Sequence, residues 1–288
     1  MRTNNPVLSR PDAFTPAQSQ GYPQGFQADA YYNPQQANTY PQSGYAPQGF
    51  GQPQDAFGRP PQGPAAGRMT IDDVIAKTAM LTLILVAAAG VAWLLLPVEL
   101  LFPVAIVGSI VAFVTVMIVA ARRNVSVPAV VAYALVEGLV IGAWSKVFEF
   151  MYPGIVMQAV IGTIVATFVV LGAYKFLGVR VSGRLAKIVV ASIIGYAVVS
   201  LLNLVLLLVG VNLGWAAIGA SAGPISWLSA GLGVVLASAS LLMDFEAIEN
   251  GVRMGAPEQE SWRGAFGLIV TLVWLYTLLL RILSFFRD

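Results

Sequence analysis

The sequence predicts an all-α membrane protein: a bundle of seven transmembrane helices preceded by a disordered, cytoplasmic N-terminal tail. Two observations lead to this fold class. Of the 288 residues, 57% are hydrophobic and 10% are charged, whereas a soluble domain carries about 25% charged residues. The apolar residues also gather in uncharged runs, and several of these reach the roughly 20 residues that a helix needs to cross a bilayer.

Residues 1–68 differ in composition from the remainder and are expected to form the disordered tail. They contain 11 of the 17 prolines, 11 glutamines and 5 of the 10 tyrosines, with almost no aliphatic residues. Such a segment cannot bury enough apolar surface to offset the entropy lost on ordering. It lacks the basic and apolar regions of a signal peptide, so we expect it to be retained. Its role stays open between a solvated tail and a weak self-association or partner-binding segment.

Residues 69–288 form the predicted membrane domain, and most of its helices correspond to one apolar run each. The run 188–243 has 56 residues without a charge, which is too long for one helix. A glycine-containing turn at 210–214 divides it, and Gly223 and Pro224 open the helix that follows. The predicted helices are 76–97, 100–121, 127–147, 154–176, 186–209, 223–244 and 263–285.

The positive residues predict the orientation, because Lys and Arg accumulate on the cytoplasmic side of a membrane. Every second connection is basic, whereas the alternate connections contain only Lys146, near one end. We therefore expect a multi-pass protein of the cell membrane with a cytoplasmic N-terminus. With seven spans the C-terminus would lie outside. Arg281 and Arg287 near the end oppose this and would suit a shorter or re-entrant last helix, so the side of the C-terminus stays open. The basic connections contain Arg68, Lys77, Arg122, Arg123, Lys175, Arg180, Arg184, Lys187, Arg253 and Arg263.

The composition also argues against most catalytic functions and against nucleic-acid binding. The chain has no histidine and no cysteine, which excludes Ser-His-Asp and Cys-His nucleophiles, His/Cys zinc sites and disulfides. Its 16 basic and 14 acidic residues nearly cancel, and no basic patch of the kind that binds nucleic acid is evident. We expect a protein that is not an enzyme and holds no cofactor. Any response to pH near neutrality must then rest on carboxyl groups.

Glu137 is the clearest charge within a predicted span. Intramembrane ionisable groups are costly and usually face a bundle interior or a water-filled path. Gly138 and Gly142 beside it form a small-xxx-small pair, which would let another helix approach closely. Two interpretations stay open: a hydrogen-bonded carboxyl that only holds helices together, or a proton or cation site.

A second acidic cluster ends the sixth predicted helix. Asp244 directly follows the long uncharged run, so it is the most deeply placed of the three acids. We expect it to be a buried, hydrogen-bonded carboxyl. Helical spacing puts Glu246 and Glu249 on another face, and we expect both to be solvated at the cytoplasmic mouth. Carboxylates without histidine suit a hard cation such as Ca²⁺, but no EF-hand loop is present.

Three motifs in this order resemble the Bax inhibitor-1-like family (the transmembrane Bax inhibitor motif family), particularly its actinobacterial form. The resemblance covers about residues 70–288. The motifs are Tyr133-x-x-x-Glu137-Gly138-Leu139-x-x-Gly142, Met243-Asp244-Phe245-Glu246, and Trp274-Leu275-Tyr276 followed by Leu280-Arg281-Ile282-Leu283.

The resemblance implies six helices around a central seventh and a pH-sensitive calcium leak. In the family, hydrogen-bonded aspartates on the sixth and seventh helices and an arginine latch control a pore. The sixth-helix aspartate matches Asp244 and the third-helix glutamate matches Glu137. The seventh-helix aspartate has no match, because counting back from Arg281 reaches Thr271, whose hydroxyl offers one hydrogen bond but no second carboxylate. Candidates for the latch are Arg122, Arg123 and Arg281; the last of these could also snorkel or pair with a carboxylate.

The leading hypothesis is a pH-modulated cation leak in which Asp244 gates and Glu137 lines or stabilises the path. Its partners would be the lipid bilayer and permeating Ca²⁺. The alternative is a non-conducting protein that modulates a membrane protease, another membrane protein or the stress response through its loops and tail. A secondary transporter is a weaker interpretation because no inverted repeat is evident, and an intramembrane hydrolase is weaker still.

Overall fold

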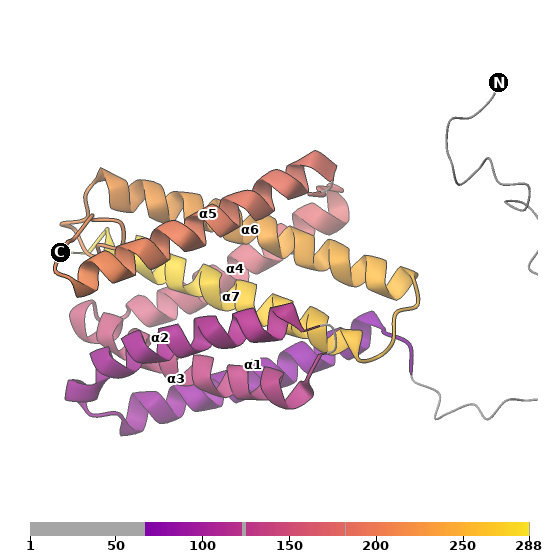
Figure 1. The fold of residues 1–288 in the computed structure, drawn as a ribbon, viewed down its shortest axis with the longest axis horizontal. Helices are drawn as coiled ribbons and strands as arrows, with labels where there is room; N and C mark the ends of the chain where they lie inside the picture. Colours follow the sequence, from indigo (N-terminus) through magenta and orange to yellow (C-terminus); the bar gives the residue numbers. More distant parts are fainter. Residues whose placement is uncertain (1–66, 123–124, 182, 288) are drawn as a thin grey trace, which may run out of the picture. The chain divides into compact units, whose positions relative to one another are not determined.

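The computed structural model describes residues 67–122, 125–181 and 183–287. Within these ranges the chain forms seven α-helices and no β-strand, and all seven are long and apolar enough to cross a membrane (Figure 1). The predicted seven-helix membrane fold is confirmed, whereas residues 1–66 of the predicted tail lie outside the described residues. The helices are α1 (Ile71–Leu95), α2 (Val98–Ala121), α3 (Val127–Met151), α4 (Ile155–Phe176), α5 (Gly183–Leu208), α6 (Pro224–Arg253) and α7 (Glu260–Ser284).

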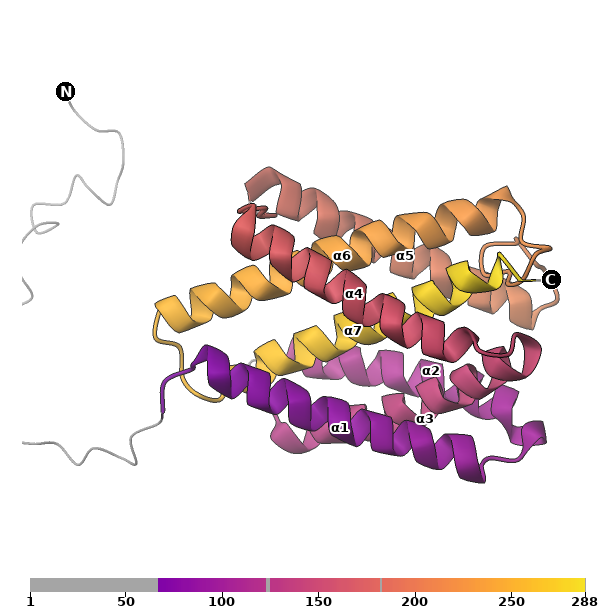
Figure 2. The same ribbon diagram turned by 180° about the vertical axis from the view of Figure 1, so that it is seen from behind.

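The helix α7 occupies the centre of the bundle. It packs directly against α1, α3, α4 and α6, and the two opposite views show it between the α1–α3 group and the α4–α6 group (Figures 1 and 2). The outer helices α2 and α5 pack mainly on α3 and α6. The arrangement expected from the resemblance therefore holds for the position of the seventh helix, whose main packing partners are α1, α3, α4 and α6.

The last helix is neither short nor re-entrant, so that alternative is wrong. Its 25 residues run from the end of the bundle at which α1 begins to the opposite end (Figure 1). Arg281 lies in its last turn, where its positive charge is favourable beside the negative end of the helix dipole.

Two helix ends differ most from the predicted ends, because polar residues extend the helices beyond the apolar runs. α1 begins at Ile71 rather than 76, after Thr70, whose side chain accepts a hydrogen bond from the backbone N–H of Asp73 at 3.1 Å. α6 continues to Arg253 rather than ending at 244. An ion pair of 2.7 Å between Glu249 and Arg253 supports its last turns.

The glycines beside Glu137 bring α1 and α3 into close contact, as predicted. A Cβ on Gly138 would lie 2.7 Å from the Cβ of Ala88, and one on Gly142 would lie 2.8 Å from the Cβ of Ala92. Both distances are shorter than a carbon–carbon contact allows. The small-xxx-small pair therefore acts as a packing surface for α1.

Candidate functional site

The carboxyl group of Asp244 lies between α6 and α7. The hydroxyl of Thr271 on α7 donates a hydrogen bond of 2.7 Å to Oδ2 of Asp244. The Ser240 hydroxyl, one turn before Asp244, lies 3.5 Å from that of Thr271. The structure thus brings together two of the predicted site residues, Asp244 and Thr271, and Ser240 joins them without having been predicted.

Gly267 lets Asp244 approach the backbone of α7. It precedes Thr271 by one helical turn, and a Cβ built on it would lie 3.3 Å from Oδ1 of Asp244. A side chain there would press on the carboxylate. Gly267 was not predicted as a site residue, although its i, i+4 spacing from Thr271 places the two on one face of the helix.

A cavity of about 560 Å³ extends from Asp244 and Thr271 toward the loop between α6 and α7. Its walls come from α2, α6 and α7, with Met69 from the segment before α1. Glu260 and Arg263 also line it, and their side chains form an ion pair of 2.7 Å between Nε and Oε2. Arg263 and Thr271 are eight positions apart on α7, which is about 12 Å along the helix axis. The cavity therefore connects a charged outer region to Asp244, which is half-buried rather than fully buried as predicted.

No cation pairs with Asp244 in the part of the chain that the structure describes: the ion pairs found there involve other acids. The described residues also contain no group of three or more acidic side chains close enough to hold a metal ion.

Glu137 approaches α7 from another side. The face of α3 on which it lies also carries Tyr133 and Ser145. Tyr133 packs edge-on against Phe266 of α7 with ring centroids 5.1 Å apart, and the Ser145 hydroxyl lies 2.8 Å from that of Tyr276. Because Glu137 lies between these two contacts, it faces α7 near residue 270, about the depth of Thr271. Glu137 and Asp244 share no hydrogen bond with each other within the described ranges.

The structure does not bring Arg122 or Arg281, two of the three predicted latch residues, to Asp244. Arg122 is exposed at the C-cap of α2, and Arg123 lies outside the described residues. Arg281 lies ten positions beyond Thr271, about 15 Å along α7. Neither Arg122 nor Arg281 forms an ion pair with the carboxyl group of Asp244.

Arg281 instead holds the loop between α5 and α6. Its guanidinium donates hydrogen bonds to the backbone carbonyls of Trp215, Ala217 (3.2 Å) and Ser226 (3.3 Å) and to the hydroxyl of Ser229 (2.8 Å). We expected Arg281 to snorkel to the interface or to pair with a carboxylate. In the structure its guanidinium instead donates hydrogen bonds to backbone carbonyl oxygens. The residue thus fastens the 210–222 loop to the end of α7.

Glu246 and Glu249 do not line the cavity. The α6 residues that line it are Ser240, Asp244, Ala247, Ile248, Gly251 and Met254. Glu249 accepts a hydrogen bond from the Tyr174 hydroxyl on α4 and pairs with Arg180 at 3.3 Å as well as with Arg253. These contacts tie the α4–α5 loop to α6, and the outer part of the cavity is formed by Glu260 and Arg263 instead.

Comparison with known protein families matches residues 5–288 to the family described as Bax inhibitor 1 like. The match extends well before residue 70, where the resemblance in the motifs begins. A search of curated proteins gives no match. Because the family match covers nearly the whole chain, and the seven helices are apolar enough to cross a membrane, the chain belongs to the Bax inhibitor 1 like family of membrane proteins.

Proposed function

We propose that this protein is a pH-modulated cation leak of the cell membrane, with Ca²⁺ as the permeating ion and Asp244 as the gating group. The observation that carries the proposal is the hydrogen bond of 2.7 Å between Thr271 and Asp244, at the inner end of the 560 Å³ cavity. The proposal involves no catalytic step and no cofactor. The ion is cargo.

The gate follows from the cost of an ionised group inside the bilayer. A neutral Asp244 can stay between α6 and α7 with its hydrogen bond to Thr271. An ionised Asp244, with no cation paired to it in the described chain, gains from contact with water or a permeating cation. Ionisation therefore favours a wider, hydrated arrangement of α6 and α7. Opening is linked to proton release, so flux should rise with pH.

Glu137 supports the same path from the α3 side of α7. It approaches α7 at about the depth of Thr271, so a cation leaving Asp244 would meet a second carboxyl at a similar level. Its position also fits a purely structural role in the α3–α7 contact, and a Glu137→Gln variant distinguishes the two by its flux.

The charge distribution supports an orientation with the cavity open to the cytoplasm. The basic segments lie at the beginning of α1, at the end of α2, around the α4–α5 loop and around the α6–α7 loop. All of these belong to one end of the bundle (Figure 1). By the positive-inside rule this end, and with it the N-terminus, is cytoplasmic.

Ion flux in liposomes tests the function. The purified protein is reconstituted, and the flux of Ca²⁺, K⁺ and H⁺ is followed across a range of pH. We expect Ca²⁺ flux that rises with pH, a flat response in Asp244→Asn, and an unchanged response in the control Glu246→Gln, whose side chain lies outside the cavity. The same flux and pH response in Asp244→Asn as in the parent would overturn the gating role.

The alternative, a non-conducting protein that modulates a membrane protease or the stress response, has a separate test. Residues 67–69 pair with the α6–α7 loop through backbone hydrogen bonds of Met69 N–H to Ala256 (2.8 Å) and of Glu258 N–H to Gly67 (2.7 Å). The described chain therefore begins beside this loop. Loss of the cellular phenotype on deletion of residues 1–66, with flux intact, would favour the alternative.

A further inference from the structure

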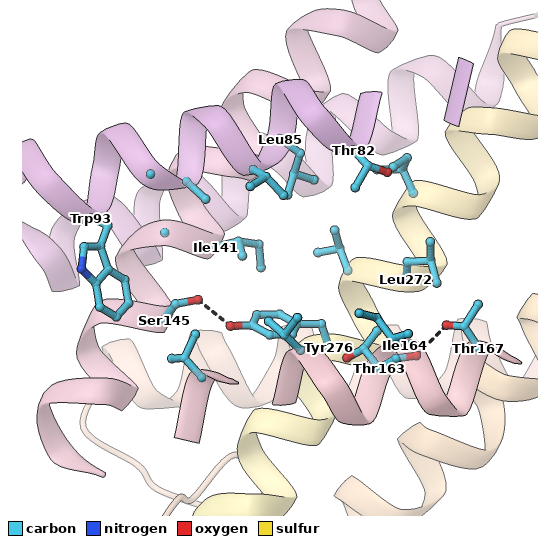
Figure 3. A pocket seen from close by; sticks show the side chains of 18 of the residues that line it. Thr82, Leu85, Trp93, Ile141, Ser145, Thr163, Ile164, Thr167, Leu272 and Tyr276 are labelled. Carbon is cyan, nitrogen blue, oxygen red and sulfur yellow. Dashed lines mark hydrogen bonds between the residues drawn. The ribbon is translucent and has the colours of Figure 1, made fainter. Parts of the chain in front are cut away.

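A second cavity, of about 650 Å³, lies on the other side of the central helix (Figure 3). Its walls come from α1 and α4, and its floor from α3 and α7. The helices α1 and α4 flank it without packing against each other. The space between them is therefore a groove that opens sideways from the bundle.

The lining of this groove offers almost no hydrogen-bonding capacity to a ligand. The Ser145 and Tyr276 hydroxyls bond to each other, as Figure 3 shows. The Thr163 and Thr167 hydroxyls donate to backbone carbonyls one turn earlier, at 2.7 Å each. The other lining residues are apolar apart from Thr82, whose hydroxyl also donates to a carbonyl one turn earlier, and Trp93. An occupant must therefore be hydrocarbon.

The groove is continuous with the lipid-facing surface of the bundle. Val86 on α1 and Ile164 and Phe168 on α4 line it and are also 57%, 51% and 68% exposed. In a membrane protein such exposed apolar side chains face acyl chains. The same hydrocarbon that covers the outer surface can thus enter the groove laterally.

The length of the groove matches one leaflet. Along α1 its lining extends from Thr82 to Trp93, which is about 16 Å at the rise of an α-helix. Half of the hydrocarbon core measures about 15 Å. The groove occupies the C-terminal half of α1, with the indole of Trp93 at its outer end, where amphipathic rings meet the lipid headgroups.

We propose that this groove is a binding site for a single acyl chain of a membrane phospholipid. The chain enters between α1 and α4 from the leaflet at the C-terminal end of α1. It lies against Ile141 of α3 and against Leu272 and Tyr276 of α7. Lipid binding in this groove does not depend on ion conduction. The test of the lipid site is therefore independent of the test of the proposed leak.

The test uses a phosphatidylcholine with a photoactivatable diazirine in its acyl chain, incorporated into liposomes with the full-length protein. After irradiation, adducts are mapped to residues by mass spectrometry. We expect adducts on the floor residues Ile141 and Leu272, in addition to those on the outer surface. Absence of floor adducts in the parent protein would overturn the site.

Gly90 provides the blocking variant. It lines the groove, and a Cβ built on it meets no atom within 4 Å. Gly90→Phe should therefore fill the groove without disturbing a packed helix and abolish the floor adducts. Gly195→Phe on α5, where a Cβ also meets nothing within 4 Å, is the matched control and should keep them. Equal floor labelling in both variants would contradict the proposal. If Gly90→Phe does not fold, Ile164→Trp narrows the groove from α4 and replaces it in the comparison.

Discussion

At the scale of single residues, Asp244 sits between a hydroxyl donor and a glycine. Thr271 donates to one carboxylate oxygen, and Gly267 leaves room for the other. A threonine cannot share a proton as a second carboxylate does, so here the titration belongs to Asp244 rather than to a coupled acid pair. The two neighbours nevertheless control how well the ionised form is tolerated while α6 and α7 stay packed.

Removing the donor from Thr271 should increase the leak. In Thr271→Val the shape is kept, but an ionised Asp244 loses a charge-assisted hydrogen bond of about 1.5–3 kcal/mol. This loss destabilises the closed, ionised state and is equivalent to a shift of roughly 10- to 150-fold toward opening at high pH. Liposome flux across pH measures it, with Thr277→Val on the same helix as the control. Lower flux at high pH in Thr271→Val would contradict this account.

Filling the space at Gly267 should weaken the contact between α6 and α7. A methyl group in Gly267→Ala lies 3.3 Å from Oδ1 of Asp244, so the carboxylate must move by a few tenths of an ångström. We expect a destabilisation of about 1 kcal/mol, measured by thermal unfolding in detergent. Gly195→Ala, in open space, should instead be neutral or slightly stabilising. A larger loss of thermal stability in Gly195→Ala than in Gly267→Ala would show that the Asp244 carboxylate does not pack against Gly267.

At the scale of elements, Arg281 joins the end of α7 to the loop between α5 and α6. Its guanidinium bonds to three carbonyls and a hydroxyl far away in sequence. In Arg281→Ala these partners lose a charged donor, and we expect a stability loss of about 2 kcal/mol together with faster proteolysis within 210–222. Arg281→Lys keeps the charge but not the forked geometry, so it should rescue only part of the loss. Full rescue by lysine would show that charge alone matters.

The sequence predicted these elements well where hydrophobicity decides and poorly where tertiary contacts decide. Seven spans follow from apolar runs, because a bilayer demands them. The end of α6 does not follow from the apolar run. Hydropathy shows where the membrane-spanning part ends, whereas the helix extends further and is stabilised there by ion pairs such as that between Glu249 and Arg253. The carbonyl partners of Arg281 could not be predicted from the sequence either, because they are distant along the chain: Trp215 lies 66 positions away.

The candidate site shows the same difference between residues that the sequence pattern predicts and residues whose role depends on tertiary contacts. Asp244 was recognisable as a charge at the end of a long apolar run. Thr271 followed only from the family resemblance, by counting back from Arg281 to the position of the family's seventh-helix aspartate. Gly267 and Ser240 carry no charge, and their contacts with Asp244 and Thr271 are seen only when α6 and α7 are placed side by side. Arg263 was assigned to a basic connection, although its side chain lines the cavity that leads to Asp244.

At the scale of the whole molecule, α7 separates two cavities of different character. The cavity on the α6 side holds Asp244 and an ion pair, whereas the groove on the α1–α4 side is apolar. Thr271 and Leu272, adjacent on α7, line one cavity each. A rigid-body shift of α7 would therefore change both cavities at once. Protonation at Asp244 and lipid in the groove are thus expected to act on the same central helix.

The central claim, that ionisation of Asp244 separates the helices around its cavity, can be measured directly as a distance. The chain contains no native cysteine, so Ala121→Cys on α2 and Met254→Cys after α6 can be spin-labelled uniquely. Both positions are exposed and lie near the outer part of the cavity. Pulsed electron paramagnetic resonance in liposomes then gives the distance between the labels at low and high pH. We predict a distance that increases with pH in the parent protein and stays constant in Asp244→Asn. An equal increase in Asp244→Asn, or no change with pH in the parent, would contradict the account.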